Sequence, residues 1–106
     1  MAGFHDIYRL DTSQNVSYAA AGGASAQSAA FGAQCRAIRV CAVAAIATGT
    51  TDGIRIQIGP NPTASGTTTL VELDMSNIFK CNPGEKIAVL GNGTGTGTVN
   101  VTELID

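Results

Sequence analysis

The chain has 106 residues, a length that allows one domain with a thin core. Its net charge is −2 and its six Lys and Arg residues form no cluster, so we expect it to bind no nucleic acid. Charged residues make up 13% of the chain, about half of the usual share, and many apolar residues are alanine. This composition favours burial of part of the surface against other subunits. No apolar run approaches the ~20 residues that span a bilayer, so we expect no membrane partner.

Residues 1–34 are predicted to be an extended N-terminal arm and a loop rich in small side chains. Short extended segments are expected at Ile7–Leu10 and Val16–Tyr18. In the second half of this region the only large side chain is Phe31, and a glycine pair and the lack of an apolar stripe argue against a helix. We expect a tight loop there, or an arm lying on a neighbour. The first residues lack the apolar stretch of a signal peptide, and we therefore expect synthesis in a cytoplasm.

Residues 35–106 carry regular strand signals. Ile54, Ile56 and Ile58 recur at every second position, which is the period of a half-buried strand. Comparable segments follow at a spacing of about ten residues, as in β-sandwiches and small barrels, so we predict one all-β domain without a helix. The expected strands are Arg36–Val43 continuing to Ala47, Ile54–Ile58, Thr67–Leu73, Ile78–Cys81, Lys86–Leu90 and Thr98–Leu104.

Turn-forming residues separate these strands. Asp52-Gly53 is a hairpin-type signal, and Asn82-Pro-Gly-Glu85 has Pro and Gly where a type II turn needs them. The strands on either side of residues 82–85 are therefore expected to form a hairpin. The glycines of residues 91–97 step by two, which matches no phosphate-binding motif, so we expect a flexible hairpin loop there.

The sequence offers few groups for catalysis, and we expect no enzyme and no cofactor. His5 is the only histidine and lies near the N-terminus, where a held catalytic geometry is not expected. Leu10-Asp11-Thr12-Ser13, with Val89-Leu90-Gly91 later in the chain, resembles part of the pattern of retroviral-type aspartic proteases. In that family a Gly stands where this chain has Ser13, and an apolar residue stands where it has Arg9.

Three cysteines, Cys35, Cys41 and Cys81, allow at most one internal disulfide. Cys35 and Cys41 would be about 20 Å apart along one strand, which is too far for a bridge. No Cys or His pair has zinc-binding spacing, so we expect no metal. We interpret the cysteines as small buried hydrophobic residues.

Four segments stand out as a set, namely Cys35–Cys41, Ile54–Ala64, Ile78–Leu90 and Gly97–Leu104. They include a strand that ends in Gly-Pro-Asn-Pro and a Pro-Gly turn. Together they resemble small virion proteins of tailed bacteriophages, in particular capsid decoration, or cement, proteins. The resemblance begins at residue 35 and covers about two-thirds of the chain.

The resemblance implies a small antiparallel β-sandwich, jelly-roll-like or related, that forms a homo-oligomer, usually a trimer. Such a chain would be made in the host bacterial cytoplasm and would bind the phage major capsid protein at the capsid surface of the virion, stabilising the shell. Our candidate interface anchors are apolar residues of the N-terminal third, because aromatic side chains dominate such contacts, with core packing as the alternative for each. They are Phe4, Ile7, Tyr8 and Phe31.

Other functions stay open on the sequence alone. A head–tail connector, a tail component or a fibre-base protein would have the same kind of fold at a different copy number. A carbohydrate-binding module usually stacks exposed aromatic side chains on sugars, and this chain has three Phe, two Tyr and no Trp. The aspartic protease is the remaining alternative.

Overall fold

The structure is a computed structural model that describes residues 8–42, 53–72 and 75–106. The regular secondary structure within these ranges consists of β-strands, so the described residues include no helix long and apolar enough to cross a membrane. The prediction of an all-β fold is confirmed. The strands are β1 (Arg9–Tyr18), β2 (Ala26–Gln27), β3 (Ala37–Ala42), β4 (Ile54–Gly59), β5 (Thr69–Val71), β6 (Met75–Lys80), β7 (Lys86–Gly91) and β8 (Gly97–Ile105).

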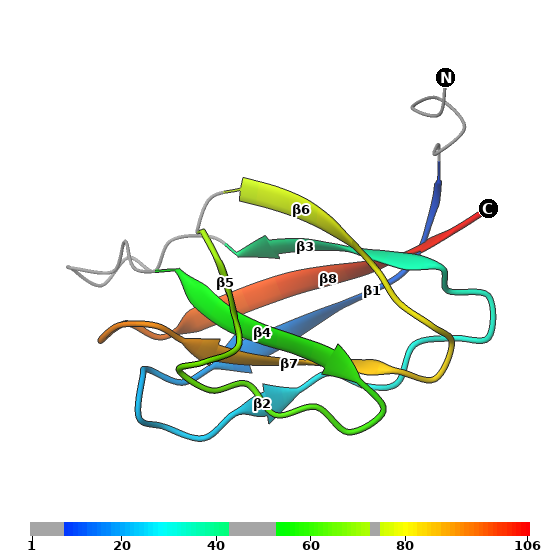
Figure 1. Cartoon of the computed structure of the whole chain (residues 1–106). Coiled ribbons are helices and arrows are strands. Elements are labelled where there is room, and N and C mark those ends of the chain that lie inside the picture. The colour runs from blue at the N-terminus through cyan, green and yellow to red at the C-terminus, as the bar shows by residue number, and fades with distance from the viewer. Residues whose placement is uncertain (1–7, 43–52, 73–74) are drawn as a thin grey trace.

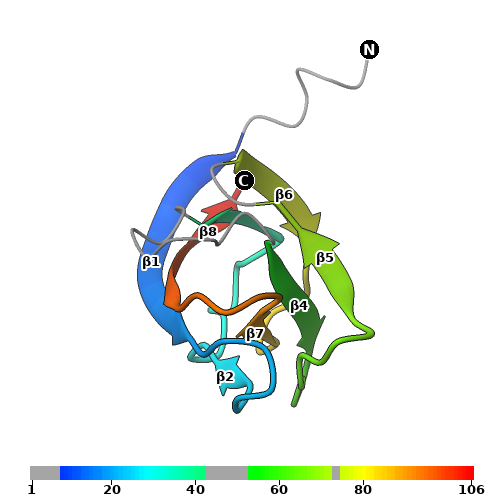
Figure 2. The ribbon, with the colours of Figure 1, turned by 90° about the vertical axis from the view of Figure 1, so that its left-hand side faces the viewer.

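The strands form two antiparallel sheets that pack against each other as a sandwich (Figures 1 and 2). The first sheet has four strands in the order β1-β8-β3-β6, and the second has four in the order β2-β7-β4-β5. Side chains from both sheets form one apolar cluster between them. The predicted antiparallel β-sandwich is therefore confirmed.

Connections between consecutive strands cross from one sheet to the other, with β4–β5 as the exception among the described strands. The hairpin predicted around residues 82–85 is therefore wrong, because β6 lies in the first sheet and β7 in the second. The turn itself is present, since Gly84 has φ +83° and the Glu85 amide donates to the Asn82 carbonyl at 3.2 Å. Turn chemistry fixes a local reversal of the chain, but it does not decide which sheet the next strand joins.

The expected hairpin turn at Asp52-Gly53 and the expected hairpin loop over residues 91–97 also differ from the structure. Gly53 has φ +80°, as a turn residue does, whereas Asp52 lies outside the described residues. The strands before and after it, β3 and β4, belong to different sheets, as do β7 and β8 on either side of the glycine run. Both connections are crossings between sheets.

The N-terminal region differs from the expected arm over residues 1–34. β1 is an edge strand of the first sheet, paired with β8 from Arg9↔Ile105 to Tyr18↔Gly97, and β2 pairs with β7. Val16 and Tyr18 face the core. The extended segment expected at Val16–Tyr18 and the described end of the one expected at Ile7–Leu10 are parts of this single strand. The polar residues between them gave no strand signal, because they carry little apolar alternation and their hydrogen-bonding partners are at the other end of the chain.

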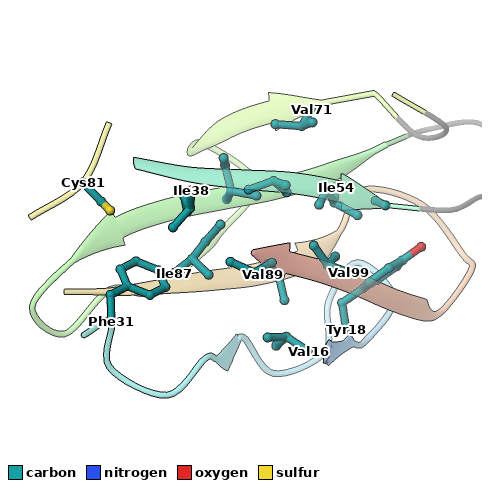
Figure 3. Close-up of a cluster of buried hydrophobic side chains, with 14 of the residues drawn as sticks. Val16, Tyr18, Phe31, Ile38, Ile54, Val71, Cys81, Ile87, Val89 and Val99 are labelled. Carbon is teal, nitrogen blue, oxygen red and sulfur yellow. The ribbon is translucent and has the colours of Figure 1, made fainter. Parts of the chain in front are cut away.

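The core lies between the sheets and is built mainly of branched aliphatic side chains (Figure 3). Along each inner strand, buried residues alternate with outward-facing ones, as the strand period requires. The fully buried large side chains come from strands of both sheets, so the two sheets share one core. They are Ile38, Val40, Ile54, Ile87, Val89, Val99 and Val101, with Cys35 at one end.

The outer side of β7 in the second sheet is covered by the chain itself. Ala88 and Leu90 point away from the main core, yet they are buried in a second cluster with Ala64 from the connection between β4 and β5. That connection is held in place because the Ala64 amide donates to the Ser25 hydroxyl at 2.9 Å. This cover explains why nearly every residue of β7 is buried.

We expect Ile87→Ala to lower the free energy of unfolding by about 2–5 kcal/mol, because it removes buried methyl groups and leaves a cavity between the sheets. Ile78→Ala on β6 is the matched control, since Ile78 is 60% exposed, and it should change stability by less than about 0.5 kcal/mol. Urea unfolding followed by circular dichroism measures both values. Equal losses would contradict the assignment of inward and outward faces.

Candidate interaction surface

The outer side of the first sheet is not covered by any described connection of the chain, and we call it the open face. It consists of the side chains that alternate with the core residues along the four strands. By strand register these side chains lie in rows across the sheet, so that each row contains one residue from every strand. They are Leu10, Ser13 and Asn15 of β1, Asn100, Thr102 and Leu104 of β8, Ala37, Arg39 and Cys41 of β3, and Ser76, Ile78 and Lys80 of β6. Three of them, Ala37, Thr102 and Leu104, are buried, so the exposed part of the face lies mainly on its edge strands β1 and β6.

The middle of the open face is a network of uncharged polar side chains. The side-chain amide nitrogen of Asn100 donates to the Ser13 hydroxyl at 2.9 Å and to the Asn15 side-chain oxygen at 3.0 Å. The Thr102 hydroxyl lies 3.2 Å from both the Ser13 hydroxyl and the side-chain amide oxygen of Asn100. These bonds fix the orientation of the four side chains. They leave further lone pairs and protons free to meet a partner's polar groups.

One of the two positively charged side chains on the open face forms a hydrogen bond to another residue of that face. Arg39 donates from its guanidinium to the Ser76 hydroxyl at 2.8 Å, which holds the side chain across β3 and β6. Lys80 is the other charged residue among the outward positions and lies one row further along β6. A face with few charges has a low cost of desolvation when another protein covers it.

One end of the open face is hollowed and carries exposed apolar side chains beside charged ones. A hollow of about 320 Å³ is lined by Tyr8, Arg36, Ala37, Ile78, Lys80 and Asp106. Ala37 is buried and belongs to neither core cluster, so it forms an apolar part of the lining. Leu10 lies in the same row as Ala37 and is 72% exposed, and Ile78 lies in the next row and is 60% exposed. Exposed apolar side chains grouped beside a hollow mark sites of protein contact more often than single ones do.

A second hollow, of about 310 Å³, lies where the edge strands β5 and β6 of the two sheets approach each other. It is lined in part by Leu70, which is 47% exposed, and by Phe79, which packs against the core. Leu70 pairs with Arg55 and faces the outer side of the second sheet, so it lies on a different face of the sandwich from Ile78. We therefore use Leu70 as the point of comparison for the open face.

The four predicted interface anchors have different positions. Tyr8 is half-buried in the lining of the first hollow, as an interface residue would be. Phe31 is 3% exposed and lies among the core side chains in Figure 3, so it is a core residue and is unavailable to a partner. Its packing follows from the path of the chain between β2 and β3, which closes one end of the sandwich. Phe4 and Ile7 lie outside the described residues.

Leu10 and Ile78 were missed as candidate contact residues. Ile78 and Phe79 are adjacent apolar residues, so alternation alone does not tell which of the two faces out. A signal was available in Lys80, because a lysine two positions away on the same strand points to the same face as Ile78. Leu10 precedes an irregularity in the β1–β8 pairing between Leu10 and Ser13, which simple alternation does not anticipate.

The groups considered for catalysis are not assembled into a site among the described residues. Asp11 is exposed at the irregularity of β1 and is part of a strand, whereas the aspartic protease pattern requires a turn. His5 is outside the described residues. The described residues also contain no group of three or more His, Cys, Asp or Glu side chains arranged to hold a metal ion.

The cysteines differ in their surroundings. Cys41 is half-buried on the open face, whereas Cys35 and Cys81 are buried, and the sulfur atoms of that pair are 3.3 Å apart. Burial raises the pKa of the Cys35 thiol, and it raises the pKa of the Cys81 thiol to about 12, with the hydrogen bond from Cys81 to Cys35 as a further cause. The buried Glu103 carboxylate is nearby and accepts a hydrogen bond from the Gly32 amide at 2.9 Å.

Comparison of the chain with protein-family models, with curated proteins and with solved structures gives no match. What the open face can do chemically therefore follows from its own geometry. Its polar network offers donors and acceptors in fixed positions, and the hollow at one end offers a site of mixed apolar and charged lining for side chains of a partner. Both properties suit contact with another protein surface.

We expect iodoacetamide to label Cys41 first in the native protein, and Cys35 and Cys81 much more slowly. The thiolate is the reactive form, and burial together with a raised pKa keeps the buried pair protonated. Peptide mapping by mass spectrometry measures the rates, and the same reaction in urea, where all three thiols should react alike, is the control. Labelling of Cys81 as fast as Cys41 in the native protein would contradict the packing described here.

Proposed function

We propose that this chain is a non-enzymatic virion structural protein that binds the outside of a tailed-phage capsid shell and stabilises it. The observation that carries the proposal is the asymmetry of the sandwich. The chain's own connection covers the outer side of β7 in the second sheet, whereas no described connection covers the open face. The open face also carries the exposed Leu10 and Ile78.

The strand order supports a jelly-roll winding, which is an eight-strand double sheet used by viral capsid domains and other proteins. Consecutive strands occupy matching places in the two sheets: β1 with β2, β8 with β7, β3 with β4, and β6 with β5. A ribbon of paired strands wrapped once around a core produces this correspondence. The proposal joins this winding to the resemblance of the sequence motifs.

In the proposed complex the open face lies on the capsid protein. The Asn100 and Thr102 network meets polar groups of the shell, and Ile78 and Leu10 supply the apolar contacts, with Tyr8 at the margin. A decoration protein acts by bridging capsid subunits, since the area it buries is lost when the subunits separate. The same binding stabilises the decoration protein itself, because the partner binds its folded state.

A homotrimer is part of the proposal and is supported by the low share of charged residues, 13% of the chain. A local symmetry axis of a capsid offers a site to a protein of matching symmetry, and trimers fit the threefold positions. We place the open face against the shell and leave the contact between copies to the remaining surfaces.

The copy number of the chain in purified phage particles tests the proposed location. We expect a ratio near one to one with the major capsid protein, or another large icosahedral multiple. Quantitative mass spectrometry of particles from the source of the chain measures it. A few copies per particle would assign the chain to the neck or tail instead, and its absence from particles would overturn the virion function.

Ile78→Asp is expected to weaken binding to capsid shells that lack this chain by about 30-fold, because it replaces an exposed apolar contact on the open face by a charge. Leu70→Asp on β5 is the matched control, with comparable exposure, and should bind as the unchanged protein does. Co-sedimentation with shells gives the affinities, and thermal unfolding shows that both variants fold. Weaker binding by Leu70→Asp alone would place the contact surface on the other side of the molecule.

A further inference from the structure

Two buried cysteines meet at one end of the sandwich, although they are far apart in the sequence. Cys35 precedes β3 and Cys81 follows β6, and these strands are antiparallel neighbours in the first sheet. The pairing continues past the strand ends, because the Cys81 amide donates to the Arg36 carbonyl at 3.2 Å. The backbones that carry the two thiols are therefore held side by side by the sheet.

The two sulfur atoms are 3.3 Å apart, and a disulfide requires about 2.05 Å. A movement of roughly 1.2 Å along the line between them would bring them to bonding distance, and rotation about a side-chain torsion is the ordinary way for a thiol to move. The Cys35 thiol also lies 3.3 Å from the Ala37 carbonyl oxygen, so the side chain is already oriented within the end of the core.

Neighbouring segments close this end of the sandwich around the pair. The Phe31 amide donates to the Glu85 carbonyl at 2.8 Å, and the Gly84 amide donates to the Phe31 carbonyl at 2.9 Å. These bonds join the segment before Cys35 to the turn after Cys81. The third cysteine, Cys41, points to the open face and lies at the opposite end of β3 from Cys35, so it does not compete for either partner.

We propose that Cys35 and Cys81 form a disulfide that locks β3 to β6 when the chain meets an oxidising disulfide compound. The reaction is thiol–disulfide exchange. The two thiols give up two protons and two electrons to one molecule of oxidised glutathione, one sulfur–sulfur bond forms as another breaks, and two molecules of reduced glutathione leave. This inference concerns the chain's own fold and does not depend on the proposed virion function.

The burial that protects the thiols also decides when the bond forms. A raised pKa leaves little thiolate at neutral pH, and the negative charges of Glu103, and of Glu85 at Cys81, act in the same direction. Exchange in the closed native state is therefore slow, and the bond forms during folding or when this end of the sandwich opens. Once formed, it is shielded from reducing agents by the same packing.

The test is refolding of the reduced, unfolded chain in a glutathione redox buffer. Glutathione can reach both thiols in the unfolded chain, so burial does not limit the rate of exchange. Alkylation in denaturant followed by peptide mapping then reports the state of each cysteine. We expect a Cys35–Cys81 cross-linked peptide and a free Cys41. The cross-linked form should melt higher than the reduced form by on the order of 10 °C, because the bond closes a long loop in the unfolded chain.

Cys41→Ser is the matched control and should form the same cross-link, leaving no free thiol. Cys81→Ala removes one partner and should show no rise in Tm on oxidation, whatever its own stability. Three free thiols in the refolded wild-type chain would overturn the proposal, as would a cross-link that includes Cys41. A Cys35–Cys81 bond that lowers the Tm would show that it forms at the expense of the native packing, which the proposal excludes.

Discussion

The first sheet depends on its last strand, because β8 lies between β1 and β3 and supplies hydrogen-bonding partners to both. The start of the chain thus has no ladder to join until the end of the chain is in place. Pairing between residues so far apart has a large entropic cost of loop closure, which the buried apolar area between the sheets must offset. The core and the open face both depend on this placement of β8 between β1 and β3.

The alternation of Ile54, Ile56 and Ile58 was enough to predict a half-buried strand, and β4 has this register, with Ile58 at its partly exposed end. The predicted β-sandwich follows from several such segments separated by turn residues. Strand pairing was not predictable in the same way. Gly84 has the conformation of the turn, but the hydrogen bonds that place β6 and β7 in different sheets lie outside the turn.

The contact surface was predictable only in part. Tyr8 was identified from its aromatic character and does line the hollow, whereas Phe31 was identified for the same reason and is in the core. A side chain's chemistry does not say which side of a sheet it occupies when its strand has not been recognised. The polar network of Ser13, Asn15, Asn100 and Thr102 appears only once the two ends of the chain are placed side by side.

The pairing of Arg9 with Ile105 affects the choice of position for a tag or label on this protein. Both ends of the sandwich-forming chain leave at the same end of the molecule, the end where Tyr8 and Asp106 border the hollow (Figure 1). An affinity tag or a fluorescent protein attached after Asp106 would therefore emerge beside the hollow of the open face. A label inserted instead at the β4–β5 connection would sit over the second sheet, on the opposite side of the sandwich.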